Sequence, residues 1–306
     1  MYESYYGLQE RPFDLSPNPR FLCFTPQHRE ALAHLEYGLA GRPGVTVLVG
    51  EAGTGKTTLV RKALQASSGA STIVHLSNPT LTRAEFYEYI AAGFGFSAEA
   101  GRSKIQFLRE VDAALNNPGS PRLALIVDEA QSVPYELLEE IRLLTNAESS
   151  IGRSIAVGLV GQPELGRRLD EARLRQLKQR VVLRCELTPL SLKDTAAYIS
   201  ARVKTAGGEA TRLFSRDAVV SIHQYSTGIP RVISVICDNA LVNGFAADQK
   251  PVGAGTVMEV CRSLSLPFNE AKAAPAPAPV RAPEPVAVAQ RAPMFGTFGR
   301  RRFSFF

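Results

Sequence analysis

The segment GEAGTGKT, residues 50–57, has the residue types and spacing of a loop that binds a polyphosphate. Such a loop points backbone N–H groups inward, and its three glycines leave that approach free of side chains. Lys56 then offers an ammonium to the β and γ phosphates, and Thr57 offers a hydroxyl to the Mg²⁺ that bridges them. We therefore expect ATP and Mg²⁺ as cofactors, with nucleotide contacts from Gly50, Glu51, Ala52, Gly53, Thr54, Gly55, Lys56, Thr57 and Thr58.

A second chemistry-bearing segment is LALIVDEAQ, in which an apolar run delivers Asp128 and Glu129 to its end. Asp128 is suited to hold Mg²⁺, and Glu129 to orient and polarise the water that attacks the γ-phosphate. An acidic pair after a strand can also merely cap a turn, but the phosphate-binding pattern upstream favours the catalytic interpretation. We expect Thr57 and Asp128 to be the metal ligands.

Two amides follow other apolar runs that end near the same place. Gln162 could contact the γ-phosphate or the attacking water, although a Gln before Pro is more commonly a helix-start residue. Asn78 could hydrogen-bond Glu129 and hold it inactive until a partner binds. On spacing alone, the switch role of Asn78 is the weaker interpretation.

Arginines are the third group, since an arginine from a neighbouring subunit can stabilise the charge that develops during phosphoryl transfer. Arg231 lies in the segment GIPR, whose turn fixes a helix start and aims the side chain back toward the sheet. Four further arginines surround the last apolar run: Arg173, Arg175, Arg180 and Arg184.

The elements that must position these residues alternate between two types. Apolar runs predict strands, and segments with helical spacing lie between them, which favours a parallel α/β sheet flanked by helices. The predicted strands are residues 45–49, 72–76, 123–127, 155–160 and 181–187, and the helices between them are residues 83–94, 102–116 and 135–145. After Pro189 only helices are predicted, at residues 191–206, 215–225, 230–245 and 256–263, and these form a small all-helical lid domain.

Composition and motif positions divide the chain into residues 1–40 as an N-terminal segment, 41–188 as the α/β ATPase domain, 189–266 as the lid, and 267–306 as an Ala/Pro-rich disordered linker. The linker ends in FGTFGRRRFSFF, which is either a docking segment for protein or membrane or a non-functional extension. No apolar stretch approaches the roughly 20 residues that span a bilayer, and the start lacks a secretion signal, so we expect a cytoplasmic protein.

The net charge of +6 gives limited support to nucleic acid as a partner. Six basic and two acidic residues lie from residue 267 onward, which leaves 29 basic and 27 acidic residues in the rest of the chain. Residues 1–266 are nearly neutral, and this gives little support for DNA binding, because nonspecific DNA affinity depends on clustered basic residues. Nucleic acid is therefore the less favoured partner.

Together the segments resemble an AAA+ ATPase, with Walker A, Walker B, a sensor 1 polar residue, a box VII arginine and a sensor 2 GxPR motif in the usual order. A closer resemblance is to the ExeA or general secretion pathway A family, including ATPases associated with exosortase and polysaccharide export. It rests on MYESYYGLQERPFDLSPNPRFL, DEAQ, GQPEL, LRQLKQR and GIPRVI, and covers about residues 1–266.

This resemblance implies roles for individual residues. Gln162 becomes sensor 1 and Arg231 sensor 2, while Arg180 is the first choice for the intersubunit finger and Arg175 the second. The resemblance, and not composition, implies that the N-terminal segment packs on the nucleotide site, with residues 13–21 near the adenine. The alternative is that Phe13, Pro17, Pro19 and Phe21 simply pack the first helix.

The resemblance also implies a function: an ATP-hydrolysing motor or switch that forms a homo-oligomer with intersubunit ATP sites and serves a secretion, pilus or polysaccharide-export machine. The secretion members continue into a membrane-spanning helix and a peptidoglycan-binding domain, which this sequence does not show, so we expect a protein partner in a membrane-associated complex and peripheral location at the inner membrane. The alternative is a DNA-associated regulator resembling transposition target-selection proteins. A nucleotide sensor without turnover is disfavoured by the intact Lys56, Asp128 and Glu129.

Overall fold

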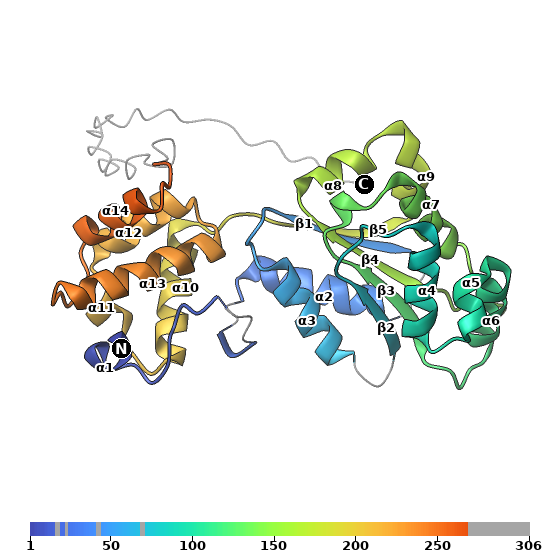
Figure 1. The fold of residues 1–306 in the computed structure, drawn as a ribbon, viewed down its shortest axis with the longest axis horizontal. Coiled ribbons are helices and arrows are strands. Elements are labelled where there is room, and N and C mark those ends of the chain that lie inside the picture. Colours follow the sequence, from blue (N-terminus) through green and yellow to red (C-terminus); the bar gives the residue numbers. More distant parts are fainter. Residues whose placement is uncertain (16–18, 22–23, 41–43, 68–70, 269–306) are drawn as a thin grey trace, which may run out of the picture. The chain divides into compact units, whose positions relative to one another are not determined.

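Five parallel strands form one sheet in the order β2-β3-β4-β1-β5 (Figure 1). The structure, a computed structural model, describes residues 1–15, 19–21, 24–40, 44–67 and 71–268. All five predicted strands are confirmed to within one residue at each end: β1 (Val45–Gly50), β2 (Ser71–Leu76), β3 (Arg122–Val127), β4 (Ala156–Gly161) and β5 (Val181–Leu187).

Alternate strand residues point to opposite faces of the sheet, and each face is covered by helices. On one face, α2 (Pro26–Leu39) and α3 (Lys56–Ala66) pack against strand residues that include Leu48, Ile126 and Val160. The other face is covered by α4 (Arg83–Phe94), α6 (Lys104–Asn116), α7 (Tyr135–Leu144), α8 (Pro163–Leu169) and α9 (Arg175–Lys178). Burial on both faces explains why the strands read as continuous apolar runs.

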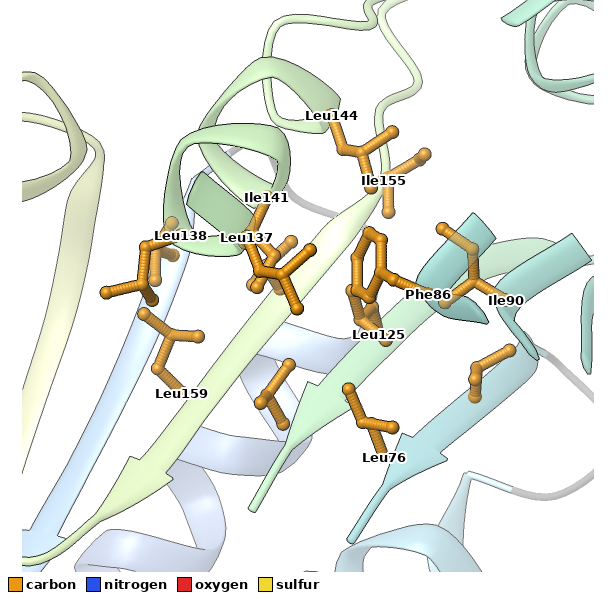
Figure 2. Packing of buried hydrophobic residues seen from close by; sticks show 14 of the residues in the cluster. Leu76, Phe86, Ile90, Leu125, Leu137, Leu138, Ile141, Leu144, Ile155 and Leu159 are labelled. Carbon is orange, nitrogen blue, oxygen red and sulfur yellow. The ribbon is translucent and has the colours of Figure 1, made fainter. Parts of the chain in front are cut away.

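The larger of these two cores is visible in Figure 2, where side chains of α4 and α7 pack onto the strands. Phe86 and Ile141 are completely buried there, and they face Leu125 and Leu159 of two neighbouring strands. Burying one such side chain stabilises the fold by about 1.5–3 kcal/mol. This packing holds the ends of β3 and β4, which carry the polar residues of the site, in fixed register.

The helix predicted over residues 102–116 is confirmed as α6, which begins at Lys104 rather than at Arg102. A short helix, α5 (Ala98–Arg102), precedes it and ends there because Ser103 adopts extended backbone angles of φ −126° and ψ 113°. The Ser103 side chain accepts a hydrogen bond from the N–H of Gln106 and so caps α6. The segment of α5 contains no large apolar residue, and the sequence analysis did not predict this helix.

From Pro189 to the end of the described residues the named elements are all helices, as predicted. Its elements are α10 (Leu192–Thr205), α11 (Ala210–Leu213), α12 (Arg216–Ser226), α13 (Pro230–Ala246) and α14 (Ala254–Ser263). They share one apolar core with the N-terminal residues Tyr2, Tyr6, Leu8, Phe13 and Phe21. The helical domain is therefore completed by the start of the chain.

The contacts of α1 (Tyr2–Tyr6) show how firmly the first residues join the helical domain. Tyr2 donates a hydrogen bond to Asp238, Tyr5 packs edge-on against Phe245, and Tyr6 donates to the carbonyl of Gln249 at 3.1 Å. Residues 1–40 thus contribute to two cores, because α2 packs on the sheet while α1 packs in the helical domain. The domain boundaries drawn from sequence stay a prediction.

Residues Met1–Lys272 form one compact unit. The linker and the Phe/Arg-rich C-terminus predicted for residues 267–306 lie outside the described residues from residue 269 onward, as does Pro17. Within the part of the chain that the structure describes, no helix has the length and apolar character needed to cross a bilayer.

Candidate nucleotide-binding site

The phosphate loop, residues 50–57, connects the end of β1 to the start of α3. Gly53 and Gly55 have φ angles of 82° and 99°, in the left-handed region that glycine adopts without strain. A Cβ at Gly50 would lie 2.9 Å from both the Leu187 carbonyl and Thr54 Oγ1. The glycines are therefore required by backbone geometry, as the sequence pattern predicted.

Lys56 is 5% exposed, and its ammonium donates to the carbonyls of Gly50 at 2.8 Å and Glu51 at 3.0 Å. Burial lowers the pKa of Lys56, and the carboxylates of Glu129 and Asp128 oppose that shift. The hydrogen-bond acceptors are carbonyl oxygens, which carry only partial charge. A bound phosphate would supply the full negative charge that favours this cation.

The fold brings together Thr57, in the first turn of α3, and Asp128, which directly follows β3. Thr57 Oγ1 donates to Asp128 Oδ2 at 2.8 Å, and Asp128 is buried at the end of β3. A hydroxyl and a carboxylate are the hard oxygen ligands that Mg²⁺ prefers, with the remaining positions left to phosphates and water. The pair fits the predicted metal site.

Glu129 follows Asp128 with φ 51°, a left-handed conformation that is unfavourable for a residue with a Cβ. Its Oε2 atom accepts hydrogen bonds from Gln131 Nε2 at 2.6 Å and Gln162 Nε2 at 3.4 Å. Gln162 is also the N-cap residue of α8, which confirms its interpretation as a helix-start residue, and its contact with the γ-phosphate or the attacking water stays a prediction. The predicted neighbours Glu129 and Gln162 therefore meet at the carboxyl edge of the sheet.

Asn78 is not placed as the sequence interpretation required. Its Oδ1 accepts a hydrogen bond from the N–H of Thr80 at 3.4 Å, and no hydrogen bond joins it to Glu129 among the described residues. The exposed Asn78 forms a local turn after β2. Gln131, to which the sequence gave no role beyond membership of the DEAQ segment, makes the contact with Glu129 instead.

Arg231 links the helical domain to the phosphate loop. Its backbone N–H donates to the Gly53 carbonyl at 3.2 Å, and a Cβ on Gly53 would lie 2.8 Å from Arg231 Cβ. A cavity of about 370 Å³ opens at this junction. Its lining includes Lys56, Thr57 and Glu129 from the α/β part and Tyr198, Arg202 and Arg231 from the helical domain.

His28 also lines the cavity, and the sequence analysis gave it no role. Its Nε2 lies 3.0 Å from the Thr54 carbonyl, and its Nδ1 lies 2.6 Å from Thr25 Oγ1. Because a carbonyl only accepts, Nε2 carries the proton and Nδ1 accepts from the threonine. Burial lowers the pKa of His28, which favours this neutral form.

Arg202 organises the N-terminal residues at the cavity and was also missed. It donates to the carbonyls of Pro12 at 2.6 Å and Asp14 at 3.0 Å, and its guanidinium lies 5.3 Å from the ring of Phe21. Phe21 lines the cavity, whereas Phe13 packs against Phe214 in the helical core. Both phenylalanines belong to the core of the helical domain, and the position of residues 13–21 near the adenine stays a prediction.

Arg180 lies at the opposite edge of the sheet from the phosphate loop. Strand β5 pairs in parallel with β1, so that Val181 is opposite Val45 and Leu187 opposite Gly50. At about 3.3 Å per residue, the strand separates Arg180 from the loop by roughly 20 Å. Its guanidinium donates to Asn146 Oδ1 at 2.5 Å. Arg180 is therefore not placed at the phosphate loop of its own chain, and its role as an intersubunit finger stays a prediction.

Sequence comparison identifies an AAA domain, whose family matches residues 40–169. Over 259 residues the chain is 39% identical to general secretion pathway protein A of Aeromonas hydrophila, an alignment covering 84% of this chain and 47% of that protein. The chain therefore spans about half the length of this curated relative.

Two solved structures share the fold at low sequence identity. The Aeropyrum pernix ORC2 protein in its ADPNP-ADP complexes has a TM-score of 0.61 and 18% identity, covering 83% of this chain and 71% of that one. Cdc6p from Pyrobaculum aerophilum has a TM-score of 0.61 and 16% identity, covering 82% and 70%. They confirm the predicted fold, a parallel sheet flanked by helices and followed by a helical domain.

Proposed function

We propose that this chain, a homologue of general secretion pathway protein A that carries an AAA domain, binds ATP with Mg²⁺ and hydrolyses the γ-phosphate. One observation carries the proposal: the buried Lys56, the hydrogen-bonded pair of Thr57 and Asp128, and Glu129 converge at the carboxyl edge of one sheet. A cavity of about 370 Å³ beside them has room for a nucleotide.

Each residue has a separate task in this reaction. Lys56 and the phosphate-loop N–H groups bind the β and γ phosphates, and Thr57 and Asp128 hold the metal. Mg²⁺, when bound, neutralises charge that develops on the phosphates. Glu129 accepts a proton from the attacking water, and Gln162 contacts that water or the γ-phosphate.

Arg231 and Arg180 complete the site from two directions. Arg231 approaches the phosphate loop from the helical domain of the same chain, where its N–H already bonds to Gly53. Arg180 serves the site of a neighbouring subunit, since the length of β5 keeps it from its own. Hydrolysis therefore requires a homo-oligomer in which one subunit's Arg180 stabilises charge on the other's ATP.

The pathway follows from sequence relationship rather than from the chemistry of the site. We infer that the ATP cycle drives or regulates assembly of a secretion, pilus or polysaccharide-export machine, with the chain on the cytoplasmic side of the inner membrane. Its support is the 39% identity to general secretion pathway protein A. Membrane association of the full chain, compared with a chain lacking residues 294–306, tests whether the C-terminus makes that connection; unchanged association removes it from this role.

The central experiment is ATP turnover measured against protein concentration, with and without duplex DNA at moderate salt. Turnover per subunit that rises with concentration and ignores DNA supports an intersubunit site in a surface-assembly ATPase. Strong stimulation by DNA moves the protein into the target-selection class. A wild-type chain that binds ATP without hydrolysing it at any concentration overturns the proposed activity.

A further inference from the structure

The amide of Gln131 connects Glu129 to the neighbouring strand end through both of its polar atoms. Its Oε1 accepts from the N–H of Gln162 at 2.9 Å, and its Nε2 donates to Glu129 Oε2 at 2.6 Å. A backbone N–H can only donate and an ionised carboxylate can only accept, so chemistry alone dictates which end of the amide faces which partner. Gln131 is therefore held in one orientation.

Gly161, the last residue of β4, leaves the space that the Gln131 amide occupies. A Cβ at this position would lie 2.6 Å from Gln131 Oε1, closer than nonbonded atoms approach. At Gly158 in the same strand, the nearest atom to an added Cβ is Ile126 Cγ1 at 3.6 Å, an ordinary contact. The two glycines thus differ in whether they make room for Gln131.

Arg168 of α8 fixes the backbone on which Gln131 sits. Its guanidinium donates to the carbonyls of Gln131 and Val133, the second at 2.8 Å, and lies 4.4 Å from the centre of the Tyr135 ring. The backbone of residues 131–133 is therefore held by a side chain from another element, and these Arg168 hydrogen bonds are called the loop clamp. Such support is needed because Glu129 holds an unfavourable positive φ, which persists only where surrounding contacts fix it.

We propose that Gln131 is a positioning residue for hydrolysis, which holds the Glu129 carboxylate by its Oε2 atom so that Oε1 can accept a proton from water. Arg168 acts through Gln131 by fixing its main chain. In the reaction, the water oxygen bonds to the γ-phosphorus, the bond to the β–γ bridging oxygen breaks, ADP leaves with that electron pair, and one water proton passes to Glu129. This inference rests on the proposed ATPase activity and on the role of Glu129 as the base.

The test separates ATP binding from cleavage in Gln131→Met, which keeps the side chain's length but removes both hydrogen bonds. A misplaced catalytic group reduces the rate by about 100-fold. We expect the single-turnover hydrolysis rate to fall by about that factor while the dissociation constant for ATP stays within about twofold of wild type. A rate within about twofold of wild type, or a rate above it, overturns the inference, as does a parallel loss of ATP affinity.

Two further variants reach the same network from different elements, each with a matched control. Gly161→Ala displaces the amide, and Gly158→Ala adds the same methyl group to the same buried strand without touching it. Arg168→Ala removes the loop clamp, whereas Arg167→Ala removes a neighbouring exposed arginine whose ion pair is with Glu164. We expect slow hydrolysis with retained ATP binding in the first of each pair only, and partial recovery in Arg168→Lys. Equal effects within either pair contradict the network.

Glu129→Gln distinguishes failure of this inference from failure of the proposed function. If Glu129→Gln hydrolyses ATP as fast as wild type, the base was assigned wrongly and the premise fails. If Glu129→Gln is inactive while Gln131→Met is fully active, the ATPase mechanism stands and only the positioning role of Gln131 is wrong.

Discussion

The phosphate loop on one side of the cavity is shaped by its own backbone, whereas Glu129 on the other side is held by side chains from separate segments. The loop is contiguous in sequence, and its turns come from glycines and from Lys56 donating to carbonyls of the same loop. Glu129 depends on Gln131, on Gln162 at the start of α8 and, through the loop backbone, on Arg168.

This difference implies that capture of ATP and its cleavage are separable in this molecule. A loop built from backbone geometry keeps its shape when a distant side chain changes. A carboxylate held by a side-chain network loses its orientation when one member is removed, because catalysis is sensitive to displacements of about 1 Å. Substitutions on the two sides should therefore give two distinct phenotypes.

Lys56→Ala changes the loop side and has the largest expected effect on ATP binding, and hydrolysis falls with it because the nucleotide is no longer held. Hydrogen bonds from a charged donor contribute about 1.5–3 kcal/mol each, so losing two of them weakens ATP binding by about a thousandfold. Equilibrium titration with a fluorescent ATP analogue measures this. Lys62→Ala, on an exposed position of the same helix, is the control and should bind normally. Wild-type affinity in Lys56→Ala would remove the distinction between the two sides.

Glu129→Gln changes the other side and should separate the two activities most clearly. It keeps the size of the side chain but cannot accept the proton, so hydrolysis should fall by about 10⁴-fold while ATP remains bound. Single-turnover assays and nucleotide titration on the same preparation check both parts. Turnover at the wild-type rate would show that the carboxylate held by Gln131 is not the base.

Arg180→Ala extends the comparison to a residue that contacts neither the phosphate loop nor Glu129 of its own chain. We expect hydrolysis at high protein concentration to fall by about 10³-fold, with ATP affinity of the isolated subunit unchanged. Mixing Arg180→Ala with Glu129→Gln should restore turnover, because one intact site can form between the two chains. Absence of recovery in the mixture contradicts an intersubunit role, and Arg175→Ala is the matched test of the second candidate.

Most of the fold and the loop side could be predicted because their signals are local. Continuous apolar runs revealed the strands, and the glycines and Lys56 are neighbours in one short segment. The contact between Glu129 and Gln131 could not be predicted, because Gln131 is held by the N–H of Gln162, which it meets only when β3 and β4 pair. Asn78 carries the same amide group, but it lies exposed after β2, where its side chain forms a local turn with Thr80.

The same limit applies to His28 and Arg202. Their partners, the Thr54 carbonyl and the carbonyls of Pro12 and Asp14, are backbone atoms in segments far away in sequence. Every residue type has a backbone carbonyl, so an acceptor of this kind cannot be recognised from the sequence. No pattern in the sequence could therefore have distinguished these two residues from ordinary surface or core positions.

The smallest expected effect concerns His28, which touches the loop side from α2. Burial lowers its pKa below the ordinary value of 6.5, so the unfolded chain binds a proton more readily than the folded one. Stability is then lost as the pH falls through about 6.5, because protonation favours unfolding. We expect the melting temperature of the wild type to drop by about 2 °C more between pH 7.5 and 5.5 than that of His28→Gln. His34→Gln, on the same helix, is the control, and an equal drop in all three proteins contradicts the assignment.

The packing of α1 into the helical domain also determines when that domain can form during synthesis. The hydrogen bond between Tyr2 and Asp238 joins residues 236 positions apart. At about 5–20 residues per second, the first helix waits roughly 12–50 s on the ribosome for its partner. The five strands of the sheet are complete by residue 187, well before that moment. The α/β part can fold first, while the apolar face of α1 stays uncovered in the nascent chain and is open to chaperones until Asp238 and its neighbours have been synthesised.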